Sequence, residues 1–109
     1  MAELEYCQVV TTTDTREAAD VLARSAVEAR VAACAQVGSP VTSTYRWEGA
    51  VETAEEWRIT FKTPTARYAA LEAHIRERHS YDVPEILCIP VTAGNPAYLA
   101  WLTAETQVS

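Results

Sequence analysis

The stretch 31–63 reads as two long strands joined by one clear turn, Glu48-Gly49, and no other segment constrains the fold as strongly. Within it, Trp57, Ile59 and Phe61 alternate with polar residues, which is the period-two pattern of a half-buried strand. The segment Gly38-Ser39-Pro40 predicts a bulge or bend in the first of the two strands. At about 3.3 Å per residue, each strand of this hairpin would reach about 45–50 Å.

A hairpin of that length exceeds the core of a 109-residue chain, whose radius of gyration should be about 13 Å. The excess must project, and it carries Tyr45, Trp47 and Trp57 on a sheet edge that needs covering. We therefore expect other copies of the chain to cover the hairpin by strand pairing between subunits. The alternative is that a bend at Pro40 folds the strand back onto its own sheet.

The other segments place this hairpin within a β-α-β-β-α-β order that is followed by a short helix. We expect a first strand over 4–12 and a last strand over 84–91, a first helix capped by Asp14, a second helix ending at His79, and a last helix opening at Asn95-Pro96. This is the ferredoxin-like arrangement, an α/β fold of the α+β kind. The first and last strands are apolar on both faces, which predicts that both occupy the centre of the sheet.

Charge and composition narrow the class of protein. The net charge of −6 repels phosphate backbones, so we expect no nucleic-acid partner. No apolar run approaches the ~20 residues of a membrane span, and the acidic residues 1–5 lack a secretory signal pattern. We expect a single cytoplasmic domain, 1–109, with no membrane partner.

The side chains of cysteine and histidine are the candidate metal ligands of this chain. The three cysteines lack C-x-x-C spacing, and their odd number argues against a disulfide framework. Cys7 and Cys88 lie in apolar strands and should be buried, whereas the surroundings of Cys34 are left open. On the second helix, His79 continues the apolar stripe, but His74 lies off it and is expected at the surface.

The stretch 79–86 is the densest run of functional side chains, and it lies where a helix ends and a strand begins. Pro84 prevents the helix from continuing. Side chains at such a crossover can leave the core and meet a ligand. The candidates are His79, Tyr81, Asp82 and Glu85. The plainer alternative is that His79 complements the helix dipole and Tyr81 only packs.

Five motifs follow one another along the chain: Ala32-Ala33-Cys34, Tyr45-Arg46-Trp47-Glu48-Gly49, Lys62-Thr63, His79-x-Tyr81-x-Val83-Pro84-Glu85-Ile86 and Gly94-Asn95-Pro96-x-Tyr98-Leu99-x-Trp101-Leu102. In this order and spacing, they resemble the CutA family of divalent-cation tolerance proteins over roughly 9–102. The resemblance implies a ferredoxin-like homotrimer joined through sheet edges, similar to PII signal transducers, and a link to tolerance of copper and other divalent metals. The departures from the family pattern are Ser80, Asp82 and Gln36, where Pro, Glu and Asn are usual.

The resemblance also implies a metal site. The Cys and His shared by the family map onto Cys34 and His79, and thiolate with imidazole suits copper, with zinc as the other candidate. Glu85 and Asp82 could add carboxylate ligands. Cys34 and His79 can meet only through the fold, within one chain or across a subunit boundary. The alternative is that Cys34 is a core residue and that His79 donates to a backbone carbonyl.

A second hypothesis, by likeness to the PII trimer, is a sensor of a small anion or metabolite at the cleft between subunits. Its candidate residues are Lys62, Tyr45, Arg46, Trp47 and Tyr81. Loss of function in Lys62→Ala, with no effect of chelators, would separate it from a metal-binding protein.

Enzymatic activity is not expected. His79, Ser80 and Asp82 are neighbours in one loop, which rarely makes a catalytic triad, and the chain has no nucleophile elbow. With three glycines in all, it also has no phosphate-cradling loop. A last alternative is a stable trimer that acts through an unidentified protein partner.

Overall fold

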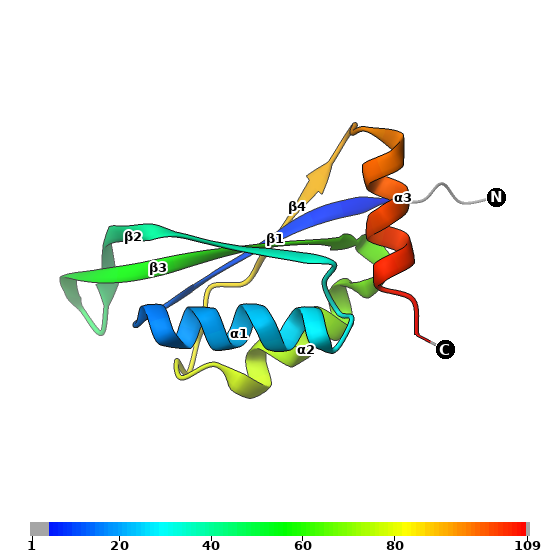
Figure 1. Cartoon of the computed structure of the whole chain (residues 1–109). Coiled ribbons are helices and arrows are strands. Elements are labelled where there is room, and N and C mark those ends of the chain that lie inside the picture. Colours follow the sequence, from blue (N-terminus) through cyan, green and yellow to red (C-terminus); the bar gives the residue numbers. More distant parts are fainter. Residues whose placement is uncertain (1–4, 109) are drawn as a thin grey trace.

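A computed structural model describes residues 5–108 (Figure 1). The elements follow in the order β1 (Tyr6–Thr13), α1 (Arg16–Glu28), β2 (Cys34–Trp47), β3 (Ala50–Pro64), the 3-10 turn η1 (Thr65–Arg67), α2 (Tyr68–Arg78), β4 (Leu87–Val91) and α3 (Pro96–Glu105). The predicted α+β order with a final helix is confirmed. Leu4, the expected start of the first strand, and the acidic residues before it lie outside the described residues.

The four strands form one antiparallel sheet in the order β2-β3-β1-β4. The predicted central position is therefore confirmed for the first strand and wrong for the last, because β4 pairs with β1 alone among the described strands. Its apolar residues are not buried by the helices: Leu87 is 55% exposed and Ile89 is 45% exposed. A strand that is apolar on both faces thus has to be covered by other segments, either of its own chain or of another chain.

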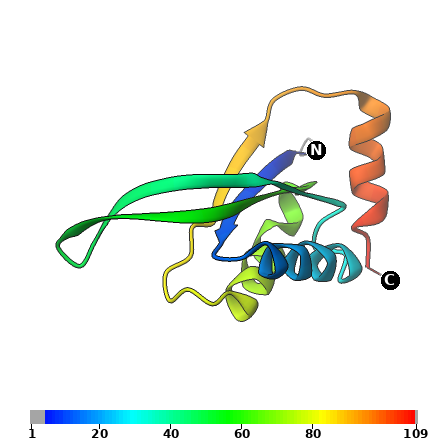
Figure 2. The same ribbon diagram turned by 60° about the vertical axis from the view of Figure 1, so that its left-hand side comes forward.

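Helices α1 and α2 lie side by side on one face of the sheet, and the main core lies between them and the strands (Figures 1 and 2). The buried face of α1 consists of small residues and one leucine, Ala19, Leu22 and Ala26, so the helix can lie close to Ile59 and Phe61 of β3. The α1 N-cap is Thr15, whose hydroxyl accepts from the Ala18 amide at 3.0 Å, and not the expected Asp14.

His74 is buried, so the expectation that it lies at the surface is wrong. Its Nε2 lies 2.8 Å from the Ser25 hydroxyl on α1, and that hydroxyl donates to the Leu22 carbonyl at 3.0 Å. The serine therefore accepts from Nε2–H, and the imidazole finds inside the core the partner that a buried polar group requires.

The hairpin of β2 and β3 is paired from Cys34↔Lys62 to Trp47↔Ala50, with a bulge between Val37 and Pro40. The strand expected from residue 31 starts at Cys34. The chain turns at Glu48 and Gly49, both with positive φ (49° and 83°), as the tight turns favoured in hairpins require. The predicted turn and bulge are confirmed, and the bend at Pro40 does not fold the strand back.

The outer part of the hairpin, residues 41–56, extends beyond the sheet. The pairing of β3 with β1 ends at Trp57↔Thr13, so no third described strand covers the outer part (Figure 2). The chain measures 48 × 25 × 23 Å, and the long axis runs through this projection.

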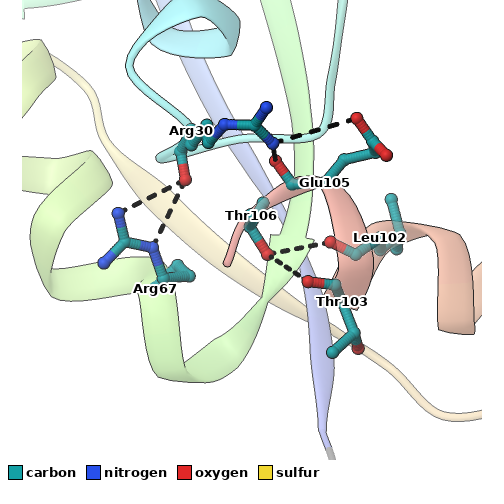
Figure 3. A network of polar contacts seen from close by, with 6 residues as sticks. All are labelled: Arg30, Arg67, Leu102, Thr103, Glu105 and Thr106. Carbon is teal, nitrogen blue, oxygen red and sulfur yellow. Dashed lines mark hydrogen bonds and ion pairs between the residues drawn. The ribbon is translucent and has the colours of Figure 1, made fainter. Parts of the chain in front are cut away.

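At the opposite end of the sheet, α3 is held by a network of polar contacts (Figure 3). Arg30 donates to the Glu105 carbonyl at 3.0 Å, and the Arg67 guanidinium donates twice to the Arg30 carbonyl at 3.3 Å. Asn95 caps α3 as predicted. None of the helices in residues 5–108 combines the length and the apolar character that a membrane span requires.

Candidate functional site

A pocket of about 360 Å³ lies between the outer part of the hairpin and the crossover from α2 to β4. Two parts of the chain that are distant in sequence contribute to it: the strands β2 and β3 near their common turn, and the crossover between α2 and β4. Its lining residues are Tyr45, Trp47, Glu52, Glu56, Tyr81, Asp82 and Val83. The pocket therefore combines three aromatic rings with three carboxylates.

The bulge in β2 decides which side chains reach this pocket. Val37 pairs with Ile59 on the face that the helices cover. Between Val37 and Pro40, β2 has one residue more than the facing part of β3, so the alternation of faces is reversed. Tyr45 therefore pairs with Glu52 on the face away from the helices. If the same residues alternated regularly from Val37 to the turn, Tyr45 and Trp47 would point toward the helix layer.

Tyr81 and Glu56 join the crossover to the hairpin. The Tyr81 hydroxyl donates to Glu56 Oε2 at 2.8 Å, and the Thr12 hydroxyl donates to the same oxygen at 3.3 Å. Burial, and secondly the bond to Glu56, raise the pKa of Tyr81 well above its ordinary value. The phenol therefore stays protonated, and its hydrogen bond orients the carboxylate.

His79 holds Tyr81 in place. One ring nitrogen, Nδ1, accepts from the Tyr81 amide at 3.1 Å, so the proton is on Nε2, which donates to the Thr12 carbonyl at 2.7 Å. The two rings lie 4.8 Å apart. Both nitrogens are thus engaged with backbone, and a metal at His79 would have to displace the Tyr81 amide from Nδ1.

Cys34 and Lys62 lie elsewhere on the sheet. They are partners across β2 and β3, and the Lys62 ammonium lies 5.8 Å from the centre of the Tyr98 ring. Lys62 pairs with Gln8 of β1, whereas His79 binds the carbonyl of Thr12, four residues further along that strand. At about 3.3 Å per residue, Cys34 and His79 therefore lie about 13 Å apart along the direction of β1.

Within one chain, the predicted ligands therefore do not assemble into a site. Cys34 and His79 are apart, and Glu85 is exposed in the crossover. Among the described residues, no three His, Cys, Asp or Glu side chains come together as a metal site. The anion hypothesis meets a similar difficulty, because Tyr45, Trp47 and Tyr81 share a pocket that Lys62 does not line.

The other two cysteines differ from one another. Cys7 is buried as expected, and burial raises the pKa of its thiol to about 12. Cys88 is exposed, contrary to expectation, because β4 lies at the edge of the sheet.

Sequence reasoning missed the acidic members of the pocket, Glu52 and Glu56. A signal for them was available in the turn. Pairing outward from Glu48-Gly49 sets Trp47 against Ala50, Tyr45 against Glu52 and Val41 against Glu56. Counting this register would have placed both carboxylates on the same face as the aromatic residues.

Comparison with known proteins gives consistent matches along the chain. A family model described as CutA1 divalent ion tolerance protein matches residues 7–105. The divalent-cation tolerance protein CutA of Thermus thermophilus is 38% identical over 98 residues, which cover 90% of this chain and 95% of that protein. The chloroplastic CutA protein of Arabidopsis thaliana is 37% identical over 91% of this chain and 54% of its own length. The chain spans about half the length of such plant relatives.

Solved structures agree with the sequence matches. The crystal structure of CutA1 from Oryza sativa superposes with a TM-score of 0.93 at 36% identity and covers 97% of each chain. The periplasmic divalent cation tolerance protein CutA from Archaeoglobus fulgidus gives a TM-score of 0.91 at 28% identity, over 94% of this chain and 99% of that one. Because these names refer to a chloroplast and a periplasm, the cytoplasmic location stays a prediction.

Proposed function

This chain belongs to the CutA1 family of divalent ion tolerance proteins, and we propose that it works as a homotrimer that binds divalent metal ions, copper above all. The proposal includes no catalytic step. It rests on one observation, which is that two candidate donors, Cys34 and Glu85, lie at opposite edges of the described sheet.

The two edges are suited to pairing with each other. The β2 edge carries Tyr45 and Trp47, which are 41% and 45% exposed, and the β4 edge carries the exposed Leu87 and Ile89. A ring of identical subunits needs two different complementary surfaces on each copy. The two edges, which pair with no further strand among residues 5–108, provide such surfaces, and joining them would also cover backbone groups that invite aggregation.

Edge pairing would also bring the metal donors closer together. Cys34 begins β2, and Glu85 lies two residues before β4, so the two donors lie at opposite edges of one chain. When the β2 edge of one subunit meets the β4 edge of the next, a thiol and a carboxylate approach each other from neighbouring chains. The thiolate favours copper, with zinc as the second choice. His79 joins this set when its Nδ1 releases the Tyr81 amide.

Native mass spectrometry of the reduced protein, with and without stoichiometric Cu²⁺ or Zn²⁺, tests both parts of the proposal. We expect a trimer that takes up three metal ions and loses them in Cys34→Ser. Cys88→Ser is the matched control, because it also removes a thiol from an edge strand and should keep the metal. His79→Ala then tells whether the imidazole contributes. A metal-free trimer, or equal uptake by the two serine variants, would refute the site, and a monomer would refute the assembly.

A further inference from the structure

We propose that the pocket between the outer part of the hairpin and the α2–β4 crossover binds an organic cation, namely a small aliphatic amine with two ammonium groups. This ligand differs both from a metal ion and from the anion expected by likeness to PII transducers. The inference follows from what lines the pocket and what does not.

The aromatic residues favour a cation of this kind. Tyr45, Trp47 and Tyr81 contribute three rings to one pocket of about 360 Å³. Tyrosine and tryptophan rings attract ammonium groups placed over their faces, and such rings line many sites that recognise organic cations. The volume lies within the range of small-molecule sites and suits a short alkyl chain between two charged ends.

The charges of the lining point to the same ligand. Glu52, Glu56 and Asp82 contribute carboxylates, and no Lys, Arg or His is among the described residues that line the pocket. An anion would therefore meet repulsion, and a bound cation would lower it. The three carboxylates are not close enough to form a metal site among the described residues. Spaced carboxylates separated by aromatic rings match a ligand whose own charges are separated by an apolar chain.

Of the three carboxylates, Glu56 is the one that hydrogen bonds from neighbouring side chains hold in place. Its Oε2 accepts from both Tyr81 and Thr12, and no described residue donates a hydrogen bond to its Oε1. The side chain is half-buried and is held by the contacts of Tyr81 with His79. A fixed carboxylate with one available oxygen binds an N–H donor at little cost in side-chain entropy. Primary ammonium groups have such donors, whereas quaternary ammonium groups have none.

The test is isothermal titration calorimetry of 1,4-diaminobutane into the reduced, chelator-treated protein, together with its tryptophan fluorescence. We expect saturable binding that weakens with salt. Glu56→Gln and Asp82→Asn should each lower the affinity about tenfold or more, because each removes a hydrogen bond to a charged group. Glu55→Gln is the matched control, since Glu55 pairs with Thr42 on the other face of the hairpin. It should bind like the wild type.

Two features keep the test decisive. Asp82 makes no side-chain hydrogen bond or ion pair with any described residue, so Asp82→Asn should leave the fold intact even where Glu56→Gln disturbs it. The uncharged 1,4-butanediol has the same chain and should not bind. No saturation by the diamine, equal binding of the diol, or equal losses in Glu55→Gln and Asp82→Asn would each overturn the proposal. Because metal is absent throughout, a failure here leaves the copper proposal standing.

Discussion

At the scale of single residues, Ser25 and His74 form a polar contact within the apolar layer between α1 and α2. Burial, and secondly the positive charge of Arg78, lower the pKa of His74 below its ordinary value of 6.5. The folded protein therefore prefers the neutral imidazole, which donates from Nε2 to the serine.

This preference predicts a pH dependence of stability. Below pH 6.5, the unfolded chain takes up a proton at His74 that the folded chain does not yet bind. The free energy of unfolding should therefore fall as the pH decreases from 6.5 toward the folded pKa, and His74 should add no pH dependence above 6.5. Denaturant midpoints at equal protein concentration measure this effect. In His74→Gln, which cannot titrate but can still donate to Ser25, the fall should be shallower, and parallel curves for the two proteins would contradict the assignment.

Residues that act through their immediate neighbours could be predicted from the sequence. Asn95 caps α3 and Glu48-Gly49 forms the turn, because both depend on local backbone geometry. His74 could not be predicted, since its burial depends on a serine 49 positions away. The pocket was predicted in part: its aromatic residues are among the candidates but Glu56 is not, and Lys62, expected at a cleft between subunits, does not line this pocket of a single chain.

At the scale of elements, the hairpin contains two glycines in different backbone conformations. Gly49 has a φ of 83°, in the left-handed region, and a methyl group there would meet nothing within 4 Å. Gly38, in the bulge, has an ordinary φ, and a methyl group there would lie 3.8 Å from the Arg58 carbonyl.

We expect Gly49→Ala to reduce the free energy of unfolding by about 1–2 kcal/mol, because the added Cβ disfavours the left-handed conformation. Gly38→Ala serves as the control and should change stability by less than about 0.5 kcal/mol. Urea denaturation of both variants measures the difference. Equal effects would mean that backbone conformation at the turn does not limit the stability of the hairpin.

Elements with a local signal were predicted well, and elements defined by their surroundings were not. The hairpin, its bulge and the two main helices follow from periodicity and turn residues. The position of β4 does not, since the same apolar sequence would suit a strand covered by helices or one covered by another chain. The sheet order decides between the two, and it rests on contacts between distant segments.

At the scale of the whole molecule, the exposed apolar edge of β4 leads to a prediction about assembly. Ile89→Lys places a charge where strand pairing between subunits would bury it, so the variant should be largely monomeric by light scattering. Val108→Lys is the control, since Val108 is 65% exposed outside the sheet and should leave the trimer intact. A trimeric Ile89→Lys protein would show that β4 does not contribute to the interface.

The bulge at Gly38-Ser39 is a place where the length of β2 can change without changing what the hairpin displays. Removing one of these two residues would restore the regular ladder, because the residues on either side of the bulge already pair with β3 on one face. The turn would still pair Tyr45 with Glu52, so both side chains would keep their side of the hairpin. In a lineage of such proteins, a single codon could thus be lost or gained at this point while the pocket kept its lining.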